Sequence, residues 1–205
     1  MSEASLLVPT PFGDGAWRWP RPPESDAAQL LAALRGHPGV RDVVVTEGHV
    51  CVSFDPAQPP RGLVERLAEA ARAGAAERAI RELWICVRYD GPDLEEVAAR
   101  VGLPPEEVVA RHAAASYRVA LVGFLPGFAY LRGLDPRLEL PRRASPRPRV
   151  TAGAVAIAGP YSGVYPLDSP GGWHWIGTAV GFRAFSPAEG AALRLGDRVR
   201  FERAT

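Results

Sequence analysis

Three segments in the second half of the chain mix glycine and proline with aromatic side chains or arginine. They are GFLPGFAYLRGL (123–134), PRRASPRPRV (141–150) and GVYPLDSPGGWHWIG (163–177). Glycine permits positive φ and close approach to a ligand, and aromatic side chains form the walls of small-molecule pockets. We therefore expect the segments to form the rim of one pocket, although core packing explains any single aromatic residue better. The predicted lining residues are Phe124, Phe128, Tyr130, Tyr165, Trp173, Gly123, Gly127, Gly171 and Gly172.

The middle segment holds the densest run of positive charge, with arginines at 142, 143, 147 and 149. A guanidinium binds a carboxylate or a phosphate through two parallel hydrogen bonds, so one or two of these arginines could hold an anionic substrate or a phosphorylated intermediate. The interleaved prolines keep the run extended, which points alternate side chains to opposite sides. We select Arg142 and Arg147 as the anion-binding residues, and a solvated surface loop is the alternative.

Three further residues could transfer a proton or donate a hydrogen bond. His112 ends a predicted helix, where it is a weak candidate for a general base and where a favourable position at the helix C-terminus is the preferred interpretation. His174 lies between two tryptophans and allows the same two interpretations. Ser169 could donate a hydrogen bond to substrate. The sequence has no G-x-S-x-G elbow and no histidine pair with metal-ligand spacing, so neither a serine hydrolase nor a metal site is expected.

Composition excludes several further classes. The chain has 205 residues, a net charge of +1 and no lysine, so all 24 basic residues are arginine. Without lysine the chain by itself forms neither a P-loop nor a Schiff base. Cys51 and Cys86 lie in separate apolar runs without metal-ligand spacing, which predicts free thiols. The longest apolar stretch, Val119–Leu131, is interrupted and too short to span a bilayer. A cytoplasmic protein that binds neither membrane nor nucleic acid is expected.

The chain up to Tyr89 alternates β-like runs with amphipathic helices. Asp26 is the predicted N-cap of the first helix and Gly36 its stop. The order βαββαβ is the split βαβ, or ferredoxin-like, plan, which assigns residues 1–89 to a small α/β domain. The expected elements are a strand at 6–12, a helix at 24–36, two strands within 41–54, a helix at 61–74 and a strand at 83–89.

After Tyr89 the pattern changes to two short helices, Asp93–Val101 and Pro104–Ala114, followed by short β-rich segments separated by glycine and proline. Short strands of this kind close into a barrel or compact sandwich, because closure protects their edges. The helix pair is similar to a helix-turn-helix, but its second helix would present Glu106 and Glu107 to a polyanion. We therefore predict two packed connecting helices and no DNA binding.

The three pocket segments and the end of the chain resemble a known family. The stretches 117–159 and 163–179, followed by LRLGDRVRF (193–201), are similar to allophanate hydrolase subunit 1, also known as the sporulation-kinase inhibitor family. Members of this family are read as the B subunit of the bacterial ATP-dependent 5-oxoprolinase. The resemblance extends from about Leu83 to Phe201. The chain departs from it at Pro160 and Tyr161, where the family commonly has glycine and glutamine, and this departure leaves the substrate open.

The resemblance implies an α+β architecture, with a small α/β N-terminal domain (1–89) and a cyclophilin-like β-barrel domain (90–205). It implies ATP-driven opening of 5-oxo-L-proline to L-glutamate, performed with the A and C subunits of 5-oxoprolinase and most directly with the C subunit. ATP then acts at the level of the complex, and this chain alone is expected to be inactive. The family's older name implies an alternative, a regulatory protein that inhibits a sensor histidine kinase.

Overall fold

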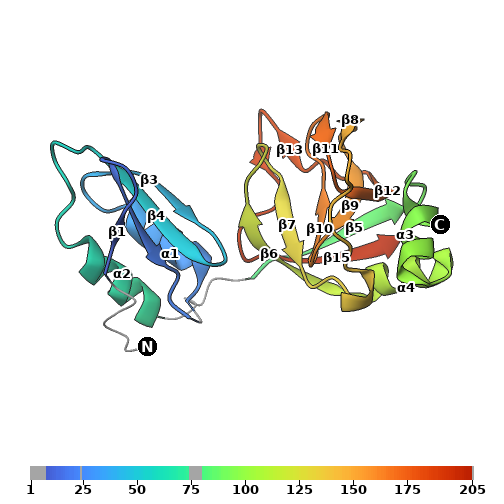
Figure 1. The fold of residues 1–205 in the computed structure, drawn as a ribbon, viewed down its shortest axis with the longest axis horizontal. Helices are drawn as coiled ribbons and strands as arrows, with labels where there is room; N and C mark the ends of the chain where they lie inside the picture. The colour runs from blue at the N-terminus through green and yellow to red at the C-terminus, as the bar shows by residue number, and fades with distance from the viewer. Residues whose placement is uncertain (1–7, 24, 74–79, 205) are drawn as a thin grey trace. The chain divides into compact units, whose positions relative to one another are not determined.

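The computed structural model describes residues 8–23, 25–73 and 80–204. The chain divides into two compact units, Met1–Ala79 and Ile80–Thr205 (Figure 1). In the described ranges, no helix is long and apolar enough to cross a membrane.

The N-terminal unit is an antiparallel sheet with two helices packed on one face. The strands are β1 (Thr10–Pro11), β2 (Ala16–Pro20), β3 (Val40–Val45) and β4 (His49–Phe54), in the order β1-β2-β4-β3. The helices are α1 (Ala27–Arg35) and α2 (Leu63–Arg72). Alternation along the strands places one set of side chains against the helices. The resulting core includes Trp19, Leu30, Leu34, Val43, Val50, Val52, Leu63 and Leu67.

The two predicted helices of this unit and the predicted strand pair within 41–54 are confirmed. The carboxylate of Asp26 accepts a hydrogen bond from the Gln29 N–H at 2.9 Å, as an N-cap does, and Gly36 is the C-cap of α1. The two strands within 41–54 form the hairpin of β3 and β4. The strand expected at 6–12 is only the two-residue β1 in its described part, and residues 6 and 7 lie outside the described residues.

The strand predicted at 83–89 belongs to the other unit. This strand, β5 (Glu82–Arg88), pairs in parallel with β15 (Arg198–Arg203) and antiparallel with β12 (His174–Val180). Its inward side chains, including Ile85 and Val87, are fully buried in the barrel core. Partners from the end of the chain, which the local pattern does not contain, therefore decide where this strand lies. The ferredoxin-like plan is not confirmed, and the boundary falls after Ala79 instead of after Tyr89.

The C-terminal unit is a closed seven-stranded barrel in the order β10-β7-β6-β15-β5-β12-β9. Its remaining strands are β6 (Ser116–Val122), β7 (Ala129–Arg132), β9 (Ala154–Ala158) and β10 (Tyr161–Val164). Two ribbons accompany the barrel: β8 (Arg147–Val150) with β11 (Ser169–Gly171), and β13 (Phe185–Ser186) with β14 (Gly190–Ala191). A 3₁₀ turn, η2, covers Pro136–Leu138. Closure pairs both edges of the sheet, as the α+β prediction with a barrel requires.

Helices α3 (Leu94–Val101) and α4 (Pro105–Ala114) pack on the barrel wall (Figure 1). Helix α3 lies against β12 and α4 against β15, and α4 buries Val108, Val109 and His112. The prediction of two packed connecting helices is confirmed, since the second helix turns these residues into the barrel core.

Candidate functional site

A cavity of about 270 Å³ opens on the barrel, and all three sequence segments contribute to it. This volume lies just below the lower end of the usual range for small-molecule pockets, about 300 Å³, which favours a small ligand. The structure thus brings together most of the predicted lining residues, which lie far apart in the sequence. The cavity is lined by Phe124, Phe128, Tyr130, Arg142, Pro146, Tyr165, Pro170, Gly171, Gly172 and Trp173.

The aromatic wall of the cavity is also a small hydrophobic core. Phe128 is buried at its centre, with T-shaped ring contacts to Tyr130, Tyr165 and Trp173 at centroid distances of 5.0, 5.2 and 5.3 Å. These rings and several alanines of β9 form a cluster separate from the main core of the barrel. Edge-to-face contacts of this type fix ring positions. These aromatic residues therefore both pack as a hydrophobic core and line the cavity.

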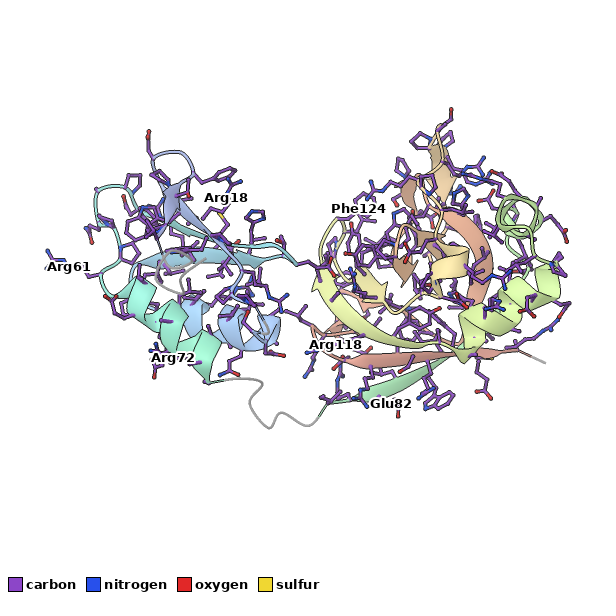
Figure 2. All side chains as sticks on the ribbon, turned by 60° about the horizontal axis from the view of Figure 1, so that its bottom comes forward. Arg18, Arg61, Arg72, Glu82, Arg118 and Phe124 are labelled. Carbon is purple, nitrogen blue, oxygen red and sulfur yellow. The ribbon has the colours of Figure 1, made fainter. Side chains whose placement is uncertain are left out.

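The turn between β6 and β7 carries Phe124 to the rim of the cavity. Figure 2 labels Phe124 on this turn. The residue is 61% exposed. Its φ of 75° lies in the left-handed region, which is unfavourable for a residue with a Cβ atom. Gly127, with φ of 82°, has no room for a side chain, because a Cβ would lie 2.6 Å from Cβ of Phe185. The turn is closed by a bond of 3.1 Å from the Gly123 N–H to the Phe128 carbonyl.

The other predicted glycines serve a different purpose from the one expected. Of the four, only Gly127 has a positive φ, so the expectation of positive φ is wrong for Gly123, Gly171 and Gly172, although Gly171 and Gly172 do line the cavity. Gly171 is instead required by close packing, because a Cβ there would lie 2.3 Å from the hydroxyl oxygen of Tyr165. Burial raises the pKa of this Tyr165 hydroxyl, which keeps it a neutral donor at the cavity wall.

The arginine run divides between the cavity and the protein's own carboxylates. Arg142 lines the cavity as predicted. Arg147 does not, because its guanidinium forms an ion pair with the buried carboxylate of Asp93. Arg143 binds the same carboxylate at 2.8 Å, and Arg149 binds Asp168 at 2.6 Å. The selection of Arg147 failed because its partner lies in a distant segment that the extended pattern of the run does not reveal.

Asp93 is a residue of the site that the sequence pattern did not indicate. Its side chain is only 1% exposed and accepts hydrogen bonds from Arg143, Arg147 and the backbone N–H of Trp175, the last at 2.8 Å. The Asp93 N–H in turn donates to the Trp175 carbonyl at 3.0 Å. An acidic residue before a helix suggests an N-cap, but this side chain makes no capping bond to α3. The only signal for its role in the sequence was an acidic residue at the start of a predicted helix.

His112 is a core residue of the barrel and does not line the cavity. It is fully buried, and burial lowers its pKa to about 3. The hydroxyl of Ser162 donates its one proton to the Ala156 carbonyl, so it can only accept from His112. The 2.8 Å contact between His112 Nε2 and Ser162 Oγ is therefore a hydrogen bond donated by Nε2–H. Tyr89 then donates its hydroxyl proton to Nδ1, also at 2.8 Å. With both ring nitrogens bonded inside the core, the structure contradicts the prediction of a general base.

The remaining candidates lie beside the cavity. His174 is buried, and its Nε2–H donates to the Pro141 carbonyl at 2.9 Å. Ser169 lies on β11, next to lining residues, with a buried hydroxyl that has no hydrogen-bond partner among the described residues. The described part of the chain contains no group of side chains able to hold a metal ion. Cys51 and Cys86 are free thiols in different units.

Comparison with known proteins gives a consistent result. Residues 18–192 match the family described as carboxyltransferase domain, subdomain C and D. The chain is 46% identical over 146 residues to the B subunit of 5-oxoprolinase from Bacillus subtilis, which covers 70% of this chain and 60% of that protein. It is 36% identical over 173 residues to the B subunit of 5-oxoprolinase from Haemophilus influenzae, covering 82% of this chain and 81% of the relative.

A solved structure shares both the fold and part of the sequence. The protein TTHA0988 is 40% identical, with a TM-score of 0.79, and the match covers 93% of this chain but only 40% of TTHA0988. The chain therefore spans less than two thirds of the Bacillus subtilis relative and less than half of TTHA0988.

Proposed function

This chain belongs to the family of 5-oxoprolinase B subunits, and from that premise we propose that it is a subunit of an ATP-dependent 5-oxoprolinase. The proposed reaction opens 5-oxo-L-proline to L-glutamate together with the A and C subunits as partners, of which the C subunit is the most direct. The names of the relatives favour an enzyme subunit over an inhibitor of a sensor histidine kinase.

The observation that carries the proposal is the small aromatic cavity with Arg142 at its wall. 5-Oxoproline is a five-membered lactam ring with one carboxylate, so it needs ring-sized apolar walls and one positive charge. Phe128, Tyr130 and Trp173 supply the walls, and the guanidinium of Arg142 matches a carboxylate. Ser169 borders the proposed substrate site, and Arg147, which the sequence suggested, is excluded because it pairs with Asp93. The proposed site comprises Phe124, Phe128, Tyr130, Arg142, Tyr165, Gly171, Gly172 and Trp173.

ATP is proposed to act in the assembled enzyme without a binding site formed by this chain alone. The lactam amide is a poor electrophile, and transfer of a phosphoryl group to its oxygen creates a leaving group. The chain has no lysine with which to form a P-loop, so the proposal assigns nucleotide binding to a partner or to a shared interface. The proposal also includes a cyclophilin-like barrel and a cytoplasmic location.

The test is 5-oxoproline-dependent release of ADP from three samples: this chain alone, the A and C subunits without it, and all three together. Activity only in the full mixture supports an obligatory enzyme subunit. Equal turnover by the partners without this chain would refute the proposal and leave the regulatory alternative.

A further inference from the structure

The cavity carries a single charge. Among its lining residues Arg142 is the one basic or acidic side chain, and the others are aromatic side chains, prolines and glycines. Within the described part of the chain, Arg142 forms no ion pair, whereas each of its neighbours Arg143, Arg147 and Arg149 has a carboxylate partner. Arg142 is exposed at the rim, and its guanidinium matches one anionic group; a second negative charge would meet no second cation among the lining residues.

Asp93 explains why Arg143 and Arg147 do not line the cavity. The carboxylates of Asp93 and Glu96 bind Arg143, and Asp93 also binds Arg147, so two cations are matched by two anions outside the cavity. The side chain of Asp93 is almost fully buried, and its loss would leave two guanidinium groups without that partner. Arg143 and Arg147 are thus held in ion pairs and are not among the residues that line the cavity.

Two hydrogen bonds to the 171–175 segment fix the backbone on both sides of Arg142. The Pro141 carbonyl accepts the Nε2–H of His174 at 2.9 Å, and the Arg143 N–H donates to the Gly172 carbonyl at 2.8 Å. Gly172 is itself a lining residue. With its two neighbours tied to the 171–175 segment, the backbone of Arg142 is fixed beside the cavity, which reduces the backbone entropy lost when a ligand binds.

We propose that the cavity binds a small ring-shaped monocarboxylate through Arg142, and that Asp93 is a positioning residue that restricts the cavity to one negative charge. The inference rests on the proposed function for the identity of the ring, 5-oxoproline. It adds that the cavity holds the substrate before phosphorylation. A phosphorylated species carries at least one additional negative charge, which this cavity does not neutralise.

Calorimetric titration of the full chain with three probes tests whether the cavity prefers a ligand with one negative charge. The probes are 5-oxo-L-proline, 2-pyrrolidinone, which has the same ring without the carboxylate, and inorganic phosphate. We expect 5-oxoproline to bind about tenfold or more tightly than either of the others. The variant Arg142→Gln is expected to lose that advantage and to bind 2-pyrrolidinone as before. No binding of 5-oxoproline, or equal binding of phosphate by the natural chain, overturns the proposal.

The variant Asp93→Asn tests the positioning role through selectivity. It is expected to lower the ratio of 5-oxoproline affinity to phosphate affinity by about tenfold, because Arg143 and Arg147 become available to anions. The matched control is Asp197→Asn, which removes another buried carboxylate of the same barrel, paired with Arg81 away from the cavity. This control is expected to lower the melting temperature without changing the ratio.

A purely structural role predicts the same ratio in both variants, and that result would overturn the assignment of Asp93. If Asp93→Asn does not fold, the variant Glu96→Gln removes one of the two carboxylate partners of Arg143 and leaves its contact with Asp93. This variant is expected to shift the ratio in the same direction by less than Asp93→Asn does. An unchanged ratio in that variant then counts against the proposal.

Failure of the inference can be told from failure of the proposed function. If the chain binds 5-oxoproline as described while ADP release does not depend on the chain, the function fails and the monocarboxylate site stands. If ADP release requires the chain but Arg142→Gln leaves the KM for 5-oxoproline unchanged, the function stands and the inference fails.

Discussion

His112 shows how burial decides the chemistry of a titratable side chain. Its ring is enclosed in the barrel core, stacks on Phe201 at 4.6 Å and is hydrogen-bonded by Tyr89 and Ser162. A proton on this imidazole would place a charge in an apolar environment, and the Tyr89 hydroxyl would have to change from donor to acceptor at Nδ1, since an imidazolium can only donate. The histidine therefore stabilises the barrel only in its neutral form.

This state predicts a loss of stability in mild acid. The folded-state pKa of about 3 lies below the ordinary value of 6.5, so between these values the unfolded chain binds more protons. The contribution of His112 is complete above pH 6.5 and falls by about 1.4 kcal/mol for each pH unit below it. Urea unfolding at pH 7.0, 6.0 and 5.0 measures this slope. The variant His112→Gln is expected to be less stable but to show a shallower slope, and an equally steep slope would contradict the assignment.

Gly171 and Gly172 form a natural pair for testing the cavity wall. A methyl group at Gly171 would overlap the Tyr165 hydroxyl, whereas at Gly172 the nearest atom, a carbon of Pro146, lies 3.7 Å away. We expect Gly171→Ala to lower the free energy of unfolding by about 1–3 kcal/mol and to weaken 5-oxoproline binding, because Tyr165 must move. Gly172→Ala is the control for stability and is expected to leave the free energy of unfolding unchanged. An equal loss of stability in both variants, measured by denaturant titration, would contradict the packing argument.

The turn between β6 and β7 combines strain with exposure. Phe124 has a left-handed backbone conformation although its side chain is mostly exposed, so packing within the barrel recovers little of that cost. Its main ring contact is with Phe128, at a centroid distance of 5.6 Å. Strain that packing does not offset is typical of segments that serve binding.

We therefore expect the variant Phe124→Gly to separate stability from activity. Glycine adopts positive φ freely, so the free energy of unfolding should be unchanged or rise by up to about 1 kcal/mol. ADP release by the full complex should fall, because the exposed ring at the rim is lost. Thermal unfolding and the ADP assay measure the two effects. A clear loss of stability with unchanged activity would show that Phe124 is a packing residue. The control Gly127→Ala should destabilise the turn, because its Cβ meets Phe185.

Elements whose position depends on neighbouring residues in the sequence could be predicted. Elements whose position depends on pairing with distant segments could not. Helix α1 follows from the cap at Asp26 and the stop at Gly36, both within one segment. Strand β5 has an equally good local pattern, but its pairing with β15 places it in the barrel. Strand β2 was not predicted at all, because its short AWRWP sequence has proline and alanine at its ends and few of the usual β-branched residues.

The same distinction applies to the site. The composition of the three segments was sufficient to predict most of the cavity lining, since glycine, proline and aromatic residues seldom combine without a structural or functional reason. The roles of Asp93 and Arg147 depend on contacts between residues 54 positions apart. The packing of Gly171 against Tyr165 likewise appears only when the strands are assembled. A single sequence indicates which residues line the cavity, but the contacts made in the closed barrel determine which of the nearby arginines form ion pairs.

All of the proposed binding machinery lies within one of the two units. The cavity, the cluster around Asp93 and the His112 network belong to residues 80–205, and the main core of that unit is formed by its own side chains. Near the beginning of the unit, Arg81 pairs with the buried Asp197, so the described chain from Ile80 onward retains the contacts of the barrel. A unit with its own closed sheet and core is expected to fold by itself.

The fragment Ile80–Thr205 is therefore expected to unfold cooperatively and to bind 5-oxo-L-proline with the affinity of the full chain. Circular dichroism on heating and calorimetric titration measure these two properties, with the fragment carrying Arg142→Gln as the control for specific binding. Because the lining residues and Asp93 are all present, a folded fragment that does not bind would show that the N-terminal unit completes the site, contrary to a cavity lined by the barrel unit alone. Binding that is retained, without recovery of ADP release in the complex, would instead assign the N-terminal unit to assembly with the partner subunits.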